Sequence, residues 1–215
     1  MRKIARLAAC ALGVCTAPAP AYENFIEIGP SFATADIETA GIDDTASGFG
    51  LDARGRVFVE GGAFLQGDVS LAFTDGTYRA TDYDFDRHVA RLGVGAAGGV
   101  GEGTIMSAIW AEIAWADTSL DPEGASATGD DELGGGVHLR FDRRDDDARF
   151  LPYAQIGYLA FEDFDGLEAK LGVRLNLVRY SPYVEARYAD LGASEAGGNV
   201  EFRPLRLHAG VRLRF

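Results

Sequence analysis

Three histidines are the side chains of this sequence best suited to acid–base chemistry near neutral pH. His88 closely follows Asp84 and Asp86, whereas His138 and His208 lie in segments where polar and apolar residues alternate. Hydrolysis at such a histidine needs an acidic partner and a nucleophile within hydrogen-bond reach. No spacing in the sequence assembles that set, so we expect no catalytic residue and no enzyme activity. His88 is the strongest candidate should the chain be a hydrolase.

Clustered carboxylates are the second feature with chemical potential, because hard divalent cations prefer oxygen ligands. Asp82, Asp84 and Asp86 match the first half of an EF-hand loop. Arg87, however, stands where the turn of that loop needs glycine, and Gly93 stands where it needs a bidentate glutamate. We therefore predict no dedicated metal site and no cofactor, and interpret most acidic clusters as solvated connections.

The first 21 of the 215 residues have the three parts of a secretory signal peptide. These parts are a basic stretch, a short apolar stretch and a small-x-small cleavage site: Arg2, Lys3 and Arg6; residues 7–14; and Ala19-Pro20-Ala21. We predict export through the Sec pathway and cleavage after Ala21. Residues 1–21 are then the signal peptide, and residues 22–215 form one domain.

Composition restricts what this domain can be. Cleavage removes Cys10 and Cys15, so no disulfide or thiol chemistry remains. It also removes three basic residues, which changes the formal net charge from −13 to −16 over 194 residues and argues against nucleic-acid binding. Lys170 is then the only lysine beside sixteen arginines. Soluble surfaces usually carry many lysines, so the domain has little ordinary aqueous exterior.

Alternation with a period of two indicates β-strands that have one apolar and one polar face. It is clearest at 167–177, where leucine, alanine and valine alternate with Glu168, Lys170 and Arg174. Similar segments, bounded by glycine, aspartate or proline, predict ten strands. Their ranges are 22–33, 48–59, 63–74, 85–97, 104–116, 133–141, 150–161, 167–177, 182–188 and 200–215.

The connections between these segments alternate between long and short. The long ones are near 34–47, 75–84, 117–131 and 190–199, and the short ones near 60–62, 98–103, 143–148 and 178–181; the connection at 162–166 is the short exception. Most acidic residues fall in the long connections. No run of 18 apolar residues is present. The pattern predicts an all-β fold, a transmembrane antiparallel up-and-down β-barrel of about ten strands, with eight as the alternative.

Alternation alone does not say which face is inside, and charge decides between the possibilities. A polar exterior should be rich in lysine, whereas a narrow interior needs mixed-sign pairs and small residues. Arginine suits such pairs because its planar fork binds carboxylates bidentately. We therefore predict that the charged residues of the strands line the lumen: Asp52, Arg54, Arg56, Asp68, Arg87, Arg91, Glu112, His138, Arg140, Glu168, Lys170, Arg174, Glu185, Arg187, Arg206 and Arg212.

The C-terminal stretch HAGVRLRF carries a family resemblance. His208, Gly210, Leu213 and Phe215 are spaced as polar, glycine, apolar and terminal aromatic. This spacing resembles the signal by which the assembly machinery recognises bacterial outer-membrane barrels. With the hairpin GFGLDARGRVFVEGGAFLQGDVSLAF and the segment DFDRHVARLGVG, the whole mature chain resembles small Gram-negative outer-membrane β-barrel proteins of the porin-family type. The resemblance implies an outer-membrane monomer with lipid, lipopolysaccharide, periplasmic chaperones and the barrel-assembly machinery as partners.

Two function classes remain open at this point. The first is a barrel with a narrow, ion-paired lumen and acidic extracellular loops, in a structural or surface-interaction role. The second is a narrow porin-like channel for ions or small solutes, and an outer-membrane hydrolase is a remote third. Ten strands lie near the size at which side chains fill a barrel. Mixed charges in the lumen favour pairing over a selectivity ring of one sign, so the first class is preferred.

Overall fold

The computed structural model describes residues 23–39, 42–78, 81–100, 104–123, 126, 128–145, 147–162, 164–177, 179–195 and 198–215. The predicted signal peptide and its cleavage site lie outside the described residues. Within these ranges, no helix is both long and apolar enough to cross a membrane.

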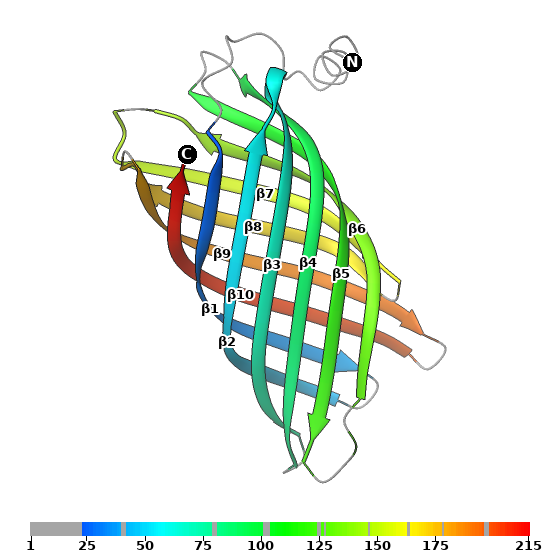
Figure 1. The fold of residues 1–215 in the computed structure, drawn as a ribbon. Coiled ribbons are helices and arrows are strands. Elements are labelled where there is room, and N and C mark those ends of the chain that lie inside the picture. Colours follow the sequence, from blue (N-terminus) through cyan, green and yellow to red (C-terminus); the bar gives the residue numbers. More distant parts are fainter. Residues whose placement is uncertain are drawn as a thin grey trace.

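Ten antiparallel strands close into one barrel (Figure 1). The strands are β1 Phe25–Thr39, β2 Ile42–Phe58, β3 Ala63–Tyr78, β4 Thr81–Val100, β5 Ile105–Pro122, β6 Thr128–Arg143, β7 Phe150–Phe161, β8 Asp165–Leu175, β9 Tyr180–Glu195 and β10 Gly198–Arg214, with a 3₁₀ turn, η1, at Glu60–Gly62. Each strand pairs with its neighbours in sequence, and β1 pairs with β10 to complete the ring. The prediction of a ten-stranded up-and-down barrel is confirmed, and the eight-stranded alternative is wrong.

The barrel is inverted relative to a soluble protein, with charges inside and apolar side chains outside. In β8, the side chains of Glu168 and Lys170 point inward and are buried. On the outward face of the same strand, Leu167 is 56% exposed and Leu171 is 65% exposed. The same alternation runs around the ring and produces an outer apolar band. Polar residues inside and apolar exposure outside therefore recur around most of the ring, and β7 is the exception because its inward residues include Leu151, Leu159 and Phe161.

The predicted long connections are wrong: at one end of the barrel, the hairpin end, most of their residues are paired strand. Asp36 pairs with Thr45 between β1 and β2, and Asp117 pairs with Asp131 between β5 and β6. Alternation fails as a guide here because the outward face changes from apolar to acidic, while the inward face carries apolar residues such as Ala35, Leu191 and Phe202. Ladder hydrogen bonds need only the backbone, so the strands continue across this change. The acidic residues expected in loops consequently lie largely on strand extensions.

Packing inside one extension explains how it stays ordered. The Tyr83 hydroxyl of β4 donates a 2.6 Å hydrogen bond to Asp44 of β2, across the intervening β3. Gly76 of β3 lies beneath the Tyr83 ring, and a side chain there would overlap it. Burial, followed by the bond to Asp44, raises the pKa of Tyr83 above its ordinary value. The extension thus has packing of its own beyond the apolar band.

The opposite end, which we call the termini end, has tight turns. Between β2 and β3, Gly61 and Gly62 adopt φ values of 84° and 82°, a region that residues with a Cβ rarely occupy. The first and last strands also meet at this end, where the Phe215 amide donates to the Asn24 carbonyl at 3.1 Å. Both ends of the barrel chain therefore lie on the short-turn side, as the even number of strands predicts (Figure 1).

Hydrogen exchange distinguishes paired extensions from loops. We expect the amides of residues 82–86, paired with β3 and β5, to exchange much more slowly than those of the turn at 147–149, because exchange requires opening of ladder bonds. Mass spectrometry of the detergent-solubilised barrel measures both segments in one experiment. Equally fast exchange in the two segments would mean that 82–86 behaves as a loop.

Candidate functional site: the charged interior of the barrel

The sixteen charged residues predicted to line the lumen lie on the inward parity of their strands. Twelve are buried: Asp52, Arg54, Arg56, Asp68, Arg91, Glu112, His138, Arg140, Glu168, Lys170, Arg174 and Glu185. Four are partly buried: Arg87, Arg187, Arg206 and Arg212. Because charges in a narrow interior are costly unless paired, the arrangement of their partners defines the site.

Arg54 is the centre of one cluster, the arginine hub. Its guanidinium lies 3.0 Å from Asp68, 3.2 Å from Glu27 and 3.0 Å from Glu185. These partners come from β3, β1 and β9, so a single side chain of β2 connects three other strands. One cation among three carboxylates leaves the hub with formal negative charge.

Glu168 is the centre of a complementary cluster, the glutamate hub. Its carboxylate accepts a hydrogen bond from Arg187 Nε at 2.7 Å and lies 3.2 Å from Arg91 and 3.4 Å from Lys170. One carboxylate among three cations leaves formal positive charge. The two hubs adjoin, since Asp68 of the first is directly opposite Arg91 of the second in the β3–β4 pair. Their excess charges therefore compensate each other.

His138 is a packed member of this network. Its Nε2 lies 3.0 Å from Glu112, and its ring stacks on Trp110 with centroids 4.9 Å apart. Gly157 on β7 leaves the space that the imidazole fills, because a Cβ there would overlap the ring. Arg91 also donates to Glu112 at 3.2 Å. The His138 imidazole is thus enclosed by the Trp110 ring, the Glu112 carboxylate and the backbone at Gly157, and it does not face an open cavity.

Sequence reasoning missed several members of the interior. Asp142 accepts from Arg140 at 2.8 Å and from Arg174 at 2.7 Å. It shares the parity of His138 and Arg140, but the predicted strand stopped one residue earlier. Glu27 lies on the polar parity of its strand and was likewise left out of the predicted set. Extending the pattern of 133–141 by one residue would have found Asp142, whereas Glu27 already lay on the polar parity of the predicted strand 22–33.

Tyr153 was missed for a different reason, because both faces of its strand are largely apolar in sequence. The Tyr153 hydroxyl donates to Glu185 at 2.9 Å, and the Arg140 guanidinium lies 4.1 Å from its ring centroid. Gly172 of β8 makes room for the ring. A tyrosine therefore joins the arginine hub to the Asp142 cluster, a role that no local pattern indicates.

Apolar layers lie on both sides of the ion pairs. Towards the termini end, Arg56 and Arg212 stack on Phe64 and Phe25 at 4.1 and 3.7 Å. Towards the hairpin end, a buried cluster contains Ala35, Val89, Ala114, Ala116, Leu159, Phe161, Ala189, Leu191 and Phe202. The two hubs consequently lie in the middle of the interior, between an apolar cluster and a layer of aromatic rings, arginines and Asp142.

His88, the strongest histidine candidate from the sequence, contacts one carboxylate and one aromatic ring. It lies on the outward face near the hairpin end, 3.6 Å from Asp117 and edge-on to Phe73. Its Nε2 has no hydrogen-bond partner among the described residues, so no serine or threonine hydroxyl is paired with it there. The structure provides no nucleophile–base pair at this histidine.

The four residues of the predicted assembly signal divide between the two faces of β10. His208 points inward, with Nε2 3.1 Å from both the Tyr183 hydroxyl and the Gly29 carbonyl. Gly210 is also inward, where a Cβ would collide with β1 backbone. Leu213 and Phe215 face outward, 40% and 70% exposed. Local packing thus accounts for the first two residues, while the exposed pair is free of such a role.

No protein-family model matches the sequence. No curated protein matches it either. Among solved structures, the outer-membrane protease OmpT from Escherichia coli superposes with a TM-score of 0.61 and 9% identity, covering 93% of this chain and 99% of OmpT. This chain therefore has an outer-membrane β-barrel fold. Neisserial surface protein A (15% identity, TM-score 0.44, covering 88% and 97%) and Ail from Yersinia pestis (13%, 0.41, covering 89% and 100%) are more distant matches.

Removing the central carboxylate tests the glutamate hub. We expect Glu168→Gln to lower the free energy of unfolding by roughly 3–5 kcal/mol, because three cations lose their shared counter-ion in a buried setting. Glu162→Gln, at an exposed position, is the matched control and should change stability by no more than about 0.5 kcal/mol. Urea titration in detergent, followed by tryptophan fluorescence, measures both. Equal effects would contradict an enclosed ion-pair network.

Proposed function

We propose that this protein is an integral outer-membrane barrel with a closed, ion-paired interior, acting in a structural or surface-interaction role and without enzyme activity. One observation carries the closed interior: Arg91 of β4 lies 3.2 Å from Glu168 of β8. Four steps around a ring of ten separate these strands, so the pair crosses most of the lumen. A second ion pair also crosses the lumen, because the Arg54 guanidinium of β2 lies 3.0 Å from the Glu185 carboxylate of β9.

The outer apolar band supports insertion into a membrane. Ile105 and Trp115, both outward-facing, are ten residues apart in β5, which is about 34 Å along a strand at ~3.4 Å per residue. With a tilt of ~45° this corresponds to about 24 Å across the bilayer, close to the ~25 Å band of outer-membrane barrels. Exposed aromatic residues stand at both edges, including Phe73 and Trp115 on one side and Phe141 and Tyr180 on the other.

The hairpin end supports a surface role. Beyond the apolar band, the strand extensions carry exposed acids on their outward parity: Asp36, Asp75, Asp84, Asp121, Asp131, Asp165 and Asp190. In a bacterial envelope this end would lie outside the cell, with short turns in the periplasm. Outer-membrane lipid and lipopolysaccharide are then the immediate partners, the acids favouring contact through bridging cations. Chaperones and the barrel-assembly machinery would act before insertion of the monomer.

A narrow channel is the second candidate. It is favoured by a cavity of about 60 Å³ inside the barrel, on the hairpin side of the ion pairs. Conduction would require the crossing pairs of the two hubs to separate, because Arg91 and Arg54 obstruct the path at rest. Opening buried pairs costs several kcal/mol, which makes the closed barrel the preferred function.

Planar-bilayer recording separates the two functions. We expect the purified full-length mature barrel to insert without stepwise conductance, because ion pairs span its interior. A sixteen-stranded porin in the same bilayer provides the positive control, and heat-modifiable migration on mild gels verifies that the sample is folded. Reproducible unitary steps from the folded protein would replace the closed role with the channel.

Deletion of Phe215 tests the proposed assembly signal. We expect severalfold less protein in outer membranes but nearly normal refolding into detergent, because one rim side chain contributes at most about 1.5–3 kcal/mol of burial, whereas a strand-adding partner would read alternate side chains. Phe141→Ala, which removes an outward aromatic at the same end of the barrel, is the control and should accumulate normally. Normal accumulation of the Phe215 deletion would exclude a role in assembly.

A further inference from the structure

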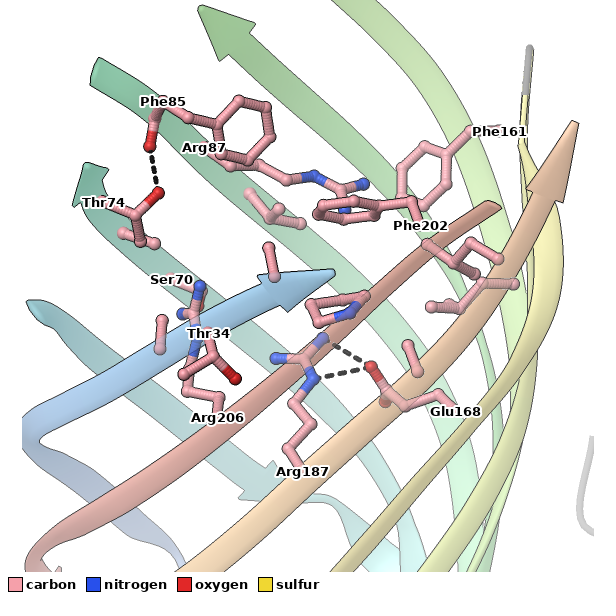
Figure 2. A pocket seen from close by; sticks show the side chains of 18 of the residues that line it. Thr34, Ser70, Thr74, Phe85, Arg87, Phe161, Glu168, Arg187, Phe202 and Arg206 are labelled. Carbon is pink, nitrogen blue, oxygen red and sulfur yellow. Dashed lines mark hydrogen bonds and ion pairs between the residues drawn. The ribbon is translucent and has the colours of Figure 1, made fainter. Parts of the chain in front are cut away.

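The cavity inside the hairpin half of the barrel combines apolar walls with a cationic floor. It has a volume of about 60 Å³. Phe85, Phe161 and Phe202 lie on the side nearer the hairpin end, whereas Arg187 and Arg206 lie at the side nearer the ion pairs (Figure 2). An apolar wall facing a polar floor is typical of sites for amphiphilic ligands.

The charged residues of the cavity lining are Arg87, Arg91, Arg187, Arg206 and Glu168. Three of the four cations already have carboxylate partners. Glu168 pairs with Arg91 and Arg187, and Asp52, from outside the lining, lies 3.0 Å from Arg206. Among the described residues, Arg87 is therefore the cation of the cavity that has no contacting carboxylate.

Arg87 occupies an aromatic setting instead. Its guanidinium lies 4.8 Å from the Phe202 ring centroid and 5.6 Å from that of Phe161. Its Nε has no hydrogen-bond partner, and no described carboxylate comes within ion-pair distance; the charge of Glu132 acts on it without such a contact. Burying a cation in this way is unfavourable. A ligand that brings one negative charge and an apolar body would relieve the cost.

We propose that this cavity binds a small organic anion with one carboxylate and an apolar body, of about the size of benzoate. The planar guanidinium of Arg87 suits a carboxylate, which it can hold bidentately, while Phe85, Phe161 and Phe202 contact the body. At ~10–15 Å³ of cavity volume per water, the cavity has room for roughly four to six waters. This is about the volume of a benzoate-sized molecule. One cation without a contacting carboxylate among the described residues suits a monoanion.

Calorimetric titration of the folded full-length mature barrel in detergent tests the ligand class. Benzoate should bind at least tenfold more tightly than benzamide, which has the same shape without the charge. It should also bind at least tenfold more tightly than inorganic phosphate, which has charge without an apolar body. Equal affinity for benzoate and benzamide, or no binding of benzoate, would overturn the proposal; equal affinity for phosphate would remove its apolar part.

Variants then locate the site. Arg87→Gln should weaken benzoate binding at least tenfold without lowering the temperature of the heat-modifiability transition, since Arg87 forms no ion pair with any described carboxylate. Arg203→Gln, which removes a cation paired with Asp190 at the same end but outside the cavity, should leave affinity unchanged. Loss of stability in Arg87→Gln, or equal weakening by both variants, would contradict a ligand contact at Arg87. These measurements are independent of conductance, so a closed barrel and a ligand site can fail separately.

Discussion

Neutralising charge in an interior too narrow for bulk water is the constraint on which this barrel depends. Ladder hydrogen bonds close the ring, but they do not determine what fills it. The two hubs do so with opposite composition, one arginine among three acids and one glutamate among three cations. Because each leaves an excess charge that the other compensates, they act as one unit, and the strands that supply them are held in register across the lumen.

The sizes of the interior side chains are matched across neighbouring strands, as their charges are. Gly157 and Gly172 stand where the rings of His138 and Tyr153 lie, so large groups on one strand are matched by absent side chains on the next. The choice of arginine follows from the same crowding, since one planar fork can contact several carboxylates, as Arg54 does. Lys170, the only lysine after residue 21, is itself buried beside Glu168, which leaves the described exterior without lysine.

The interior is graded along the barrel axis, and this gradation links architecture to function. Aromatic rings and arginines occupy the termini end, ion pairs the middle, and an apolar cluster the hairpin half. In the proposed function the middle layer obstructs conduction, whereas the boundary between the middle layer and the apolar cluster contains the cavity. A barrel closed in this way remains capable of interaction at its outer end, through the acidic strand extensions or through the cavity itself.

The sequence by itself determined the all-β barrel and which strand residues share the polar face, because a period of two depends only on neighbours along the chain; it left the strand number between about ten and eight. It did not determine the length of the hairpins, since the outward face turns acidic beyond the apolar band while the backbone still pairs. It also left out Asp142 and Tyr153, one beyond the last alternating residue and the other in a strand without contrast between faces. Only the tertiary structure decided which charges meet: Arg91 and Glu168 are 77 residues apart, and their contact depends on ring closure and stagger. Arg87 illustrates the same limit, because its lack of a contacting carboxylate among the described residues follows from where the other side chains of the cavity lining fall in space rather than from its own surroundings in sequence.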